Sequence, residues 1–327
     1  MFPTTLNSEN FLGYKLNDNK YLDTHTKYGC QSDWPEMLRY ARKLNVSVIY
    51  NNEGNVCIKM DGVVYASNIR NILNKSLNVK YLESAKKLSI QGTFFTLKNI
   101  QIKSSHSVLY NWNISDILVK FCLKARLNIL PTEYTKFLWN KENDPLCKLC
   151  KMKREYMSHV LNGCNVLNNF YSRRHDRLNK LADELKLIIQ SKSIFVNKLC
   201  ESVFPHLKEE LVKVGHRKPD ILVFSNDICY IVEITVCYDT YFEHSYTGKI
   251  ERYGMLLNCL SQHGIEAKLL VMCFGSLGCI RSNVRNNLRM LGFDSDTIKS
   301  FLSWASISCI IGANYIWRHR VKKIFNN

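Results

Sequence analysis

Four potential metal ligands, Cys147, Cys150, His159 and Cys164, follow one another with the spacing of a zinc knuckle. Zinc binds four thiolate or imidazole ligands in a tetrahedron. A Cys-x2-Cys turn places two of them on one tight loop, and His159 and Cys164 can both face inward from a short helix. The alternative is a chance arrangement in a cysteine-rich chain, but the other cysteines lack such spacing. Because four protein ligands leave no open coordination position, we expect a structural zinc.

The chain contains 13 cysteines, an odd number that argues against a complete disulfide framework. Its first residues, Met1 to Thr5, show neither a basic segment nor an apolar segment, so no secretory signal is predicted. We therefore expect reduced thiols in a nuclear or cytoplasmic protein that is not secreted. The longest apolar candidate, residues 301–317, is interrupted by serines and by Gly312-Ala313-Asn314, which argues against a membrane span.

The 45 lysines and arginines exceed the 28 acidic residues, which gives a formal net charge of +17. Such an excess favours a polyanionic partner, with a membrane surface as the competing interpretation. Two groups of basic residues recur at helical spacing: Arg173, Arg177 and Lys180, and Arg281, Arg285 and Arg289. A third basic segment spans residues 318–323. These side chains could follow nucleic-acid phosphates, although solvated helix faces are the simpler alternative.

Two acidic residues mark a second candidate site. Asp220 precedes an expected strand over residues 221–224, and Glu233 lies in an expected strand over residues 230–236. On a hairpin their carboxylates can converge on one hard cation, magnesium or manganese. Glu233 interrupts an apolar run, where a buried charge is unfavourable unless it is paired or metal-bound. The alternative is a surface hairpin with two solvated acids.

A lysine and a tyrosine complete this candidate site. In restriction-enzyme-like nucleases a lysine follows the second acid by two residues, but Thr235 stands there in this sequence. Lys249 lies at the start of an expected helix over residues 249–260 and could reach the acids from that position. Tyr253 shares the face of Lys249 one turn later. Two acids and a lysine are the minimum set of groups for metal-dependent phosphodiester cleavage.

Strands alternate with helices after residue 166, which predicts an α/β layer domain. A further strand is expected over residues 267–274, with helices over 170–190, 281–291 and 297–313. Upstream of residue 166 the pattern is mostly helical, including helices over 69–88 and 112–127. Strands at 46–50 and 56–60 form a plausible hairpin near the N-terminal end, where a helix is expected to begin at residues 32–36.

Several short motifs occur in one order: Lys124 to Thr132 (Lys-Ala-Arg-Leu-Asn-Ile-Leu-Pro-Thr), the Cys-Cys-His-Cys spacing, Arg174-His175-Asp176, Lys218-Pro219-Asp220, Glu233 and Lys249-x3-Tyr253. This order resembles the C-terminal third of non-LTR retrotransposon polyproteins that carry a restriction-enzyme-like endonuclease, the group that includes elements inserting into ribosomal RNA genes. The resemblance covers roughly residues 90–327.

The resemblance implies a restriction-endonuclease-like mixed-sheet core flanked by helices, preceded by a mostly helical linker with a zinc knuckle. The implied domains are an N-terminal extension (1–90), the linker (91–165) and an endonuclease (166–327). In the family the nuclease nicks target DNA so that the exposed 3′ end primes reverse transcription. The resemblance implies that Asp220 and Glu233 bind the catalytic metal, although the family often has aspartate at the second position. It also implies that Lys249 acts on the phosphate.

The resemblance maps the family's Arg-His motif onto Arg174 and His175, and we expect Arg174 and Tyr253 to support the substrate. DNA is the expected partner, and RNA is an open alternative. The sequence contains no Tyr/Phe-x-Asp-Asp polymerase motif and no N-terminal DNA-binding fingers. We therefore expect a fragment, a decayed copy or a host-adopted remnant. The main alternative function is a catalytically inactive nucleic-acid-binding protein, and a third is a relic without function.

Overall fold

The computed structural model describes residues 41, 44–50, 56–188, 193–214, 218–225 and 227–325. The helix start expected at residues 32–36 lies outside these residues. The chain divides into two compact units, Met1–Lys87 and Leu88–Asn327, which are described separately.

The first unit contains a small antiparallel sheet and one helix. Its strands are β1 (Val46–Tyr50), β2 (Val56–Met60) and β3 (Val63–Tyr65), paired in the order β1-β2-β3. The turn between β2 and β3 is formed by Asp61 and Gly62, both with positive φ. Val48 and Ile58 of the sheet pack with the first turn of helix α3 (Ile69–Lys86). The strands and the helix expected from the sequence are thereby confirmed.

The second unit is built on a mixed four-stranded sheet. Its strands β4 (Ile194–Val196), β5 (Ile221–Ser225), β6 (Ile228–Cys237) and β7 (Ala267–Gly275) lie in the order β4-β5-β6-β7. β4, β5 and β6 pair antiparallel, whereas β6 and β7 pair parallel. A parallel pair needs a crossover connection, and helix α13 (Phe242–Gln262) provides it. The three longer strands agree with the sequence prediction.

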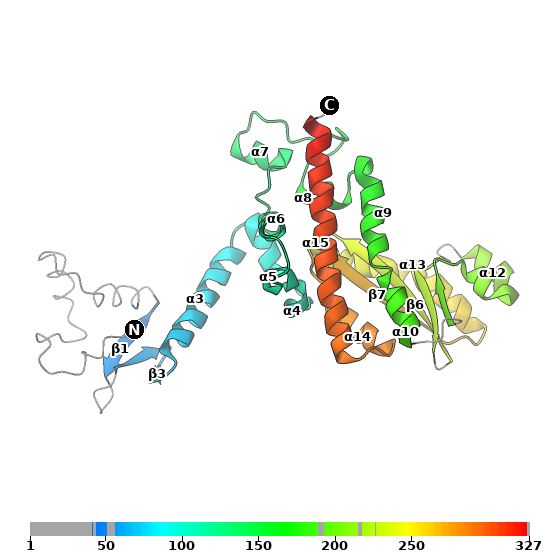
Figure 1. Ribbon diagram of the computed structural model, residues 1–327, viewed down its shortest axis with the longest axis horizontal. Helices are drawn as coiled ribbons and strands as arrows, with labels where there is room; N and C mark the ends of the chain where they lie inside the picture. Colours follow the sequence, from blue (N-terminus) through cyan, green and yellow to red (C-terminus); the bar gives the residue numbers. More distant parts are fainter. Residues whose placement is uncertain are drawn as a thin grey trace, which may run out of the picture. The chain divides into compact units, whose positions relative to one another are not determined.

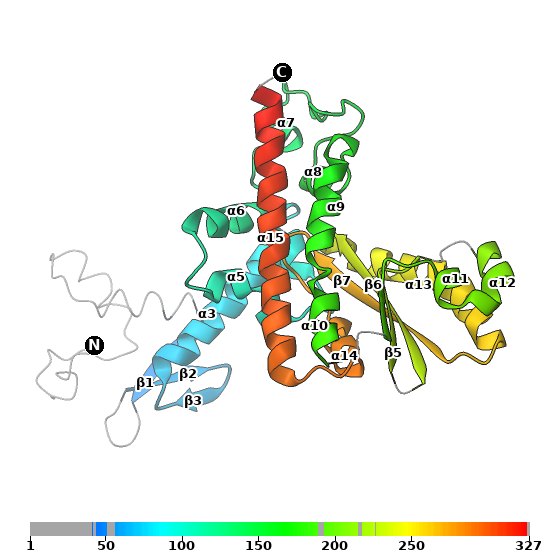
Figure 2. The same ribbon diagram turned by 45° about the vertical axis from the view of Figure 1, so that its right-hand side comes forward.

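Helices cover both faces of this sheet. One face packs against α10 (Lys180–Ile188), α14 (Asn283–Met290) and α15 (Ser295–Phe325) through apolar side chains that include Val232 and Ile234. The opposite face packs against α11 (Cys200–Val203), α12 (Lys208–Lys213) and α13 through Leu222 and Ile231. Both faces of the central strands are therefore buried, which explains their nearly continuous apolar sequences. Figure 2 shows the sheet between these helices.

A mostly helical region precedes the sheet. It contains α4 (Ile102–Ser105), α5 (Ser107–Tyr110), α6 (Asp116–Arg126), α7 (Glu133–Trp139), α8 (Met157–Asn162) and α9 (Asn168–Arg177), with short 3-10 helices η2 (Gln91–Thr96) and η3 (Asn165–Leu167). Two more, η5 (Pro205–Leu207) and η6 (Asp239–Tyr241), lie within the sheet region. The core of the helical region includes Ile310, Ala313, Ile316 and Trp317 of α15. One long helix thus contributes to the core on one face of the sheet and to the core of the helical region, and it runs beside α9 (Figure 1).

Some helix boundaries differ from those expected. The expected helix over 112–127 begins at Asp116, because the Asn111 side chain accepts a hydrogen bond from the backbone of Asn113 (3.0 Å) and holds a turn there. The expected helix over 170–190 is two helices, α9 and α10. The helix expected to begin at residue 281 is α14 and begins at Asn283. Within the residues that the structure describes, no helix is long and apolar enough to cross a membrane.

Candidate metal cluster and candidate active site

The side chains of Cys147, Cys150, His159 and Cys164 converge, with their ligand atoms within 4.8 Å of one another. The Sγ atoms of Cys147 and Cys164 are 4.0 Å apart, and Sγ of Cys150 is 3.3 Å from Nε2 of His159. Tetrahedral zinc with ordinary bond lengths separates two sulfurs by about 3.8 Å and a sulfur from a nitrogen by about 3.6 Å. The cluster can therefore hold a zinc ion.

Local backbone structure brings these ligands together. The backbone N–H of Lys151 donates to Cys147 O (2.7 Å), and Lys151 adopts a positive φ that turns the chain between the first cysteine pair and α8. His159 lies on α8, and Cys164 follows that helix after Gly163. Burial raises the pKa of the Cys147 and Cys164 thiols. A bound cation opposes this effect, because it stabilises thiolates.

A buried ion-pair network lies beside the metal cluster. Arg320 of α15 donates to Glu133, the first residue of α7, at 3.1 Å, and also to Glu155. Glu155 in turn accepts from the backbone N–H of Glu133 (2.9 Å). All three side chains are buried. The network fixes the end of α15 to the segment that carries the Cys/His ligands. It also corrects the sequence interpretation, because Arg320 is not available to a polyanion.

Asp220 and Glu233 come from neighbouring antiparallel strands. Ile221 is paired with Val232, so Asp220, one residue before β5, comes opposite Glu233. Leu222 and Ile231 pack together on the α13 face of the sheet. Because side chains alternate between faces along a strand, Asp220 and Glu233 belong to that same face.

Glu233 is buried and interacts with two side chains of α13. Lys249 Nζ donates to its Oε1, and the Tyr253 hydroxyl donates to its Oε2 at 2.7 Å. Lys249 and Tyr253 are one helical turn apart, so they present both groups to one carboxylate. Burial raises the pKa of Tyr253, and the negative charges of Glu233 and Asp220 raise it further. The phenol is therefore a permanent donor at neutral pH.

The Asp220 side chain, directly before β5, accepts a hydrogen bond from the backbone of β6. Its Oδ2 accepts from the backbone N–H of Ile234 at 2.7 Å. Nε2 of His175, on α9, donates to the carbonyl oxygen of Ile234 at 3.0 Å and lies 3.5 Å from the same Oδ2. The hydrogen bond with Asp220 raises the pKa of His175 to about 9 although burial opposes it. The imidazole is therefore cationic at neutral pH.

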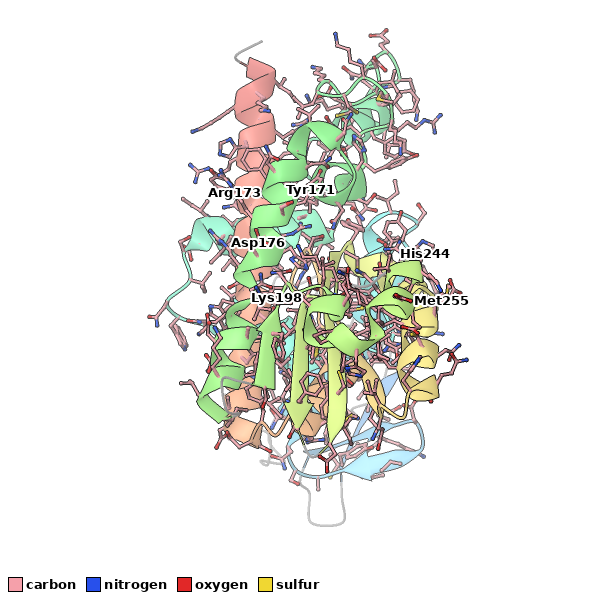
Figure 3. The ribbon with its side chains drawn as sticks, turned by 90° about the vertical axis from the view of Figure 1, so that its right-hand side faces the viewer. Tyr171, Arg173, Asp176, Lys198, His244 and Met255 are labelled. Atoms are coloured by element: carbon pink, nitrogen blue, oxygen red, sulfur yellow. The ribbon has the colours of Figure 1, made fainter. Side chains whose placement is uncertain are left out.

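Two of these groups, His175 and Lys249, border a surface pocket of about 320 Å³ between α8, α9 and the end of β6. Its wall includes His175, Asp176, Thr235 and Lys249. Thr235 lines this pocket. It stands two residues after Glu233, the sequence position at which restriction-enzyme-like nucleases have a lysine. Figure 3 shows the α9 residues Tyr171 and Arg173 on different sides of that helix, with Arg173 on the side next to α15.

Arg174 has a mainly internal position. It is buried, and its Nη1 donates to the carbonyl oxygen of Leu161 on α8 at 2.9 Å. A Cβ atom at Gly312 of α15 would lie only 2.7 Å from Arg174 Cγ, so the helices approach closely at this glycine. Arg174 also lines the pocket. It joins three helices and at the same time forms part of the wall beside His175.

The two predicted basic groups differ in their surroundings. Arg173, Arg177 and Lys180 are exposed. Arg281 does not belong to an exposed stripe: its side chain is only 12% exposed, pairs with Glu243 at 3.0 Å and lies 3.7 Å from the centre of the Tyr246 ring. It precedes α14, so the helical spacing to Arg285 and Arg289 does not apply. Arg289 is exposed, and Arg285 is half-buried.

Sequence reasoning missed several polar residues around these sites. Asn162 of α8 donates to the carbonyl oxygen of Val236 at 2.9 Å and lines the pocket. Asp239 is buried and accepts from the backbone N–H groups of Leu277 and Cys279. Neither belongs to a recognisable spacing. For Asp239 the available signal was a carboxylate two residues after the end of the long apolar strand β6, a position where a buried acid must be paired.

No known protein-family profile matches the chain. A comparison with curated proteins supports a retrotransposon-derived origin. The relative found is the "Retrovirus-related Pol polyprotein from type-1 retrotransposable element R2" of Popillia japonica, which is 27% identical over 117 residues. The aligned segment covers 36% of this chain and 22% of the relative, so the match spans about a fifth of the relative's length.

Proposed function

We propose that the unit Leu88–Asn327 is a restriction-enzyme-like DNA endonuclease that nicks its substrate with magnesium or manganese. One observation carries this proposal. Asp220 and Glu233 lie opposite each other on adjacent antiparallel strands, and Lys249 and Tyr253 contact Glu233 from α13. The mixed sheet between two helical layers and the similarity to a retrotransposon polyprotein support the same interpretation.

The donor atoms suit a hard divalent cation. Carboxylate oxygens are the ligands that magnesium and manganese prefer, and Asp220 and Glu233 would hold the ion. The observed contacts of Asp220 involve Oδ2, so Oδ1 can serve as a ligand within the described part of the site. A divalent ion supplies Lewis-acid stabilisation of the scissile phosphate and lowers the pKa of bound water.

The protein groups have separate roles in this proposal. Lys249, whose side chain is 21% exposed, holds a fixed positive charge at the pocket wall and stabilises negative charge on the phosphate. Tyr253 donates to Glu233 and fixes the orientation of that carboxylate. His175 donates to Ile234 O and faces Asp220, so it positions the other carboxylate and adds positive charge.

A catalytically inactive nucleic-acid-binding protein is the second candidate, and one observation favours it. Lys249 and Glu233 already neutralise each other, and Thr235 supplies no second cation. A satisfied ion pair of this kind can be purely structural. In that case the exposed Arg173 and Arg177 would bind nucleic acid without turnover.

Nicking of supercoiled plasmid tests the proposal. The protein is incubated with plasmid in magnesium, in manganese, in calcium and without added divalent ion, and open-circular product is quantified. We expect nicking with magnesium or manganese and its loss in the Asp220→Ala/Glu233→Ala double variant. Omitting divalent ions is preferable to adding a strong chelator, which would also remove zinc. Equal product from the wild type and the double variant would exclude this active site.

A further inference from the structure

An exposed aromatic pair lies outside the candidate active site, where α5 ends and the chain turns toward α6. Trp112 is 100% exposed, and Tyr110 is 73% exposed. Large aromatic side chains are usually buried in cores or interfaces, so two exposed rings only two residues apart in the sequence indicate a binding surface. The turn that carries them is held by hydrogen bonds: Asn111 accepts from Asn113 N through its side chain (3.0 Å) and from Ile114 N through its backbone oxygen (3.1 Å).

The two rings belong to one pocket. Tyr110 and Trp112 line a shallow hollow of about 370 Å³ together with polar residues of α4, α5, the turn and α15, namely Lys103, Ser107, Asn111, Asn113 and Ser303. Amide and hydroxyl groups can both donate and accept hydrogen bonds, as the edges of nucleic-acid bases require. The pocket therefore combines flat apolar faces with hydrogen-bonding groups that do not favour one base.

The surrounding charge selects the kind of ligand. Residues 98–126 contain the basic residues Lys98, Lys103, Lys120, Lys124 and Arg126 and a single acidic residue, Asp116. The four lysines are exposed, whereas Arg126 is buried. On α15, Lys299 lies one turn before Ser303 and pairs with Asp296 at 3.9 Å. Lys103 lines the pocket itself, and its positive charge is complementary to a polyanion.

We propose that Tyr110, Trp112 and Lys103 form a binding site for single-stranded nucleic acid, with bases stacked on the rings and the phosphate chain near the lysines. Stacking on aromatic side chains needs an exposed base face, which single strands offer and an intact duplex hides. DNA and RNA strands share this chemistry. The site does not depend on cleavage at Asp220 and Glu233, so it can be tested when nicking is absent.

Fluorescence anisotropy with labelled 20-nucleotide DNA and RNA strands, without added divalent ions, measures the affinity. We expect the Tyr110→Ala/Trp112→Ala variant to bind both strands at least tenfold more weakly, because each stacked base contributes appreciably to binding. Tyr110→Phe/Trp112→Phe should retain most of the affinity, since phenylalanine preserves the π-face. Trp139→Ala is the matched control, because Trp139 is also exposed (66%) but lies on α7.

Three outcomes decide the proposal. A loss confined to the Tyr110→Ala/Trp112→Ala variant, with binding to relaxed closed-circular duplex unchanged, supports it, and the DNA and RNA arms identify the preferred strand. An equal loss for strands and closed duplex overturns the stacking interpretation. Unchanged strand affinity also overturns it. If sedimentation then shows that the variant has lost self-association, the aromatic pair is a protein–protein contact. Unaltered zinc content and melting temperature confirm that each variant is folded.

Discussion

The Cys/His cluster and the Asp220–Glu233 site lie in the same unit but are built differently. The cluster presents four ligand atoms to one another, and three of its four side chains are buried. The carboxylate site pairs two acids on neighbouring strands, and its cations, Lys249 and His175, lie at the wall of a pocket. A site closed by four protein ligands can stabilise a fold but cannot bind substrate, whereas a site open to a pocket can.

The difference also concerns what each site contributes to stability. A bound zinc adds free energy to folding, because the unfolded chain has no preformed site. Two facing carboxylates repel each other, so among the described residues they contribute to stability through Lys249, Tyr253, His175 and the N–H of Ile234. Variants of the two sites should therefore separate activity from stability.

The largest effect is expected for the acids. Asp220→Ala and Glu233→Ala should each reduce plasmid nicking below detection while duplex binding persists, because removal of repulsive carboxylates does not weaken phosphate contacts. Lys249→Ala should slow nicking by roughly a hundredfold to a thousandfold, as a positioned cation near developing charge contributes a few kcal/mol. The double acid variant should be scarcely worse than either single variant. Nicking that survives both single substitutions would contradict the assignment.

Removal of a zinc ligand should affect the fold instead. Cys164→Ala should reduce bound zinc from about one equivalent to near zero and lower the melting temperature by roughly 10 °C or more. Cys122→Ala is the matched control, because Cys122 is equally buried in the same core but is not a member of the cluster. That variant should keep its zinc and lose about 1 kcal/mol of stability. If the two variants had the same zinc content and the same stability, the prediction of a stabilising zinc at this cluster would be wrong.

The buried ion pairs beside the cluster should show an intermediate effect. Arg320→Met would leave Glu155 buried without its cation, whereas Glu133 would keep Lys136 at 2.9 Å. We expect unfolding in urea to require about 3–5 kcal/mol less free energy. Adding Glu155→Gln to that variant should restore part of the loss. Lys186→Met breaks an exposed pair with Asp183 and should have no measurable effect. Similar midpoints for Arg320→Met and Lys186→Met would show that the network is not stabilising.

The smallest effect is expected at the exposed arginines. Arg173→Ala and Arg177→Ala should each reduce the slope of log affinity against log salt for duplex DNA by about 1, since each removes one phosphate contact. Arg285→Ala and Arg289→Ala test the second group in the same way. Arg281→Ala should leave the slope unchanged, because Arg281 already pairs with Glu243. If only Arg281→Ala changed the slope, the exposed arginines would not be the residues that contact phosphates.

The strands of the sheet could be predicted because their apolar runs are long and bounded by turn residues. Asp227, which has a positive φ, separates β5 from β6 as its residue type suggests. β4 was missed, because a three-residue edge strand gives no recognisable pattern. The helix expected to end at Ala313 continues to Phe325. Gly312 allows Arg174 to pack closely against α15. The sequence pattern suggests that this glycine ends the helix, whereas its role in the structure is this tertiary contact.

The contacts of Glu233 follow partly from local rules. A charge inside an apolar strand requires partners, and Lys249 and Tyr253 share one helix face, so the sequence could relate these three residues. The contact of His175 with Asp220 depends on how α9 packs against β6, which no local pattern specifies. The pairing of Arg281 with Glu243 is likewise a product of tertiary structure, and the sequence therefore suggested an exposed arginine where the fold leaves one half-buried.

The long helix α15 has a consequence for biosynthesis. It supplies Ile298, Phe301 and Leu302 to the core under the sheet and Ile316 and Trp317 to the core of the helical region. With 31 residues it is about 46 Å long. Ribosomes deliver the chain from its N-terminal end, so every other element of this unit emerges before α15. Both cores stay open until that helix arrives, and a nonsense codon anywhere before residue 295 would leave neither region able to close.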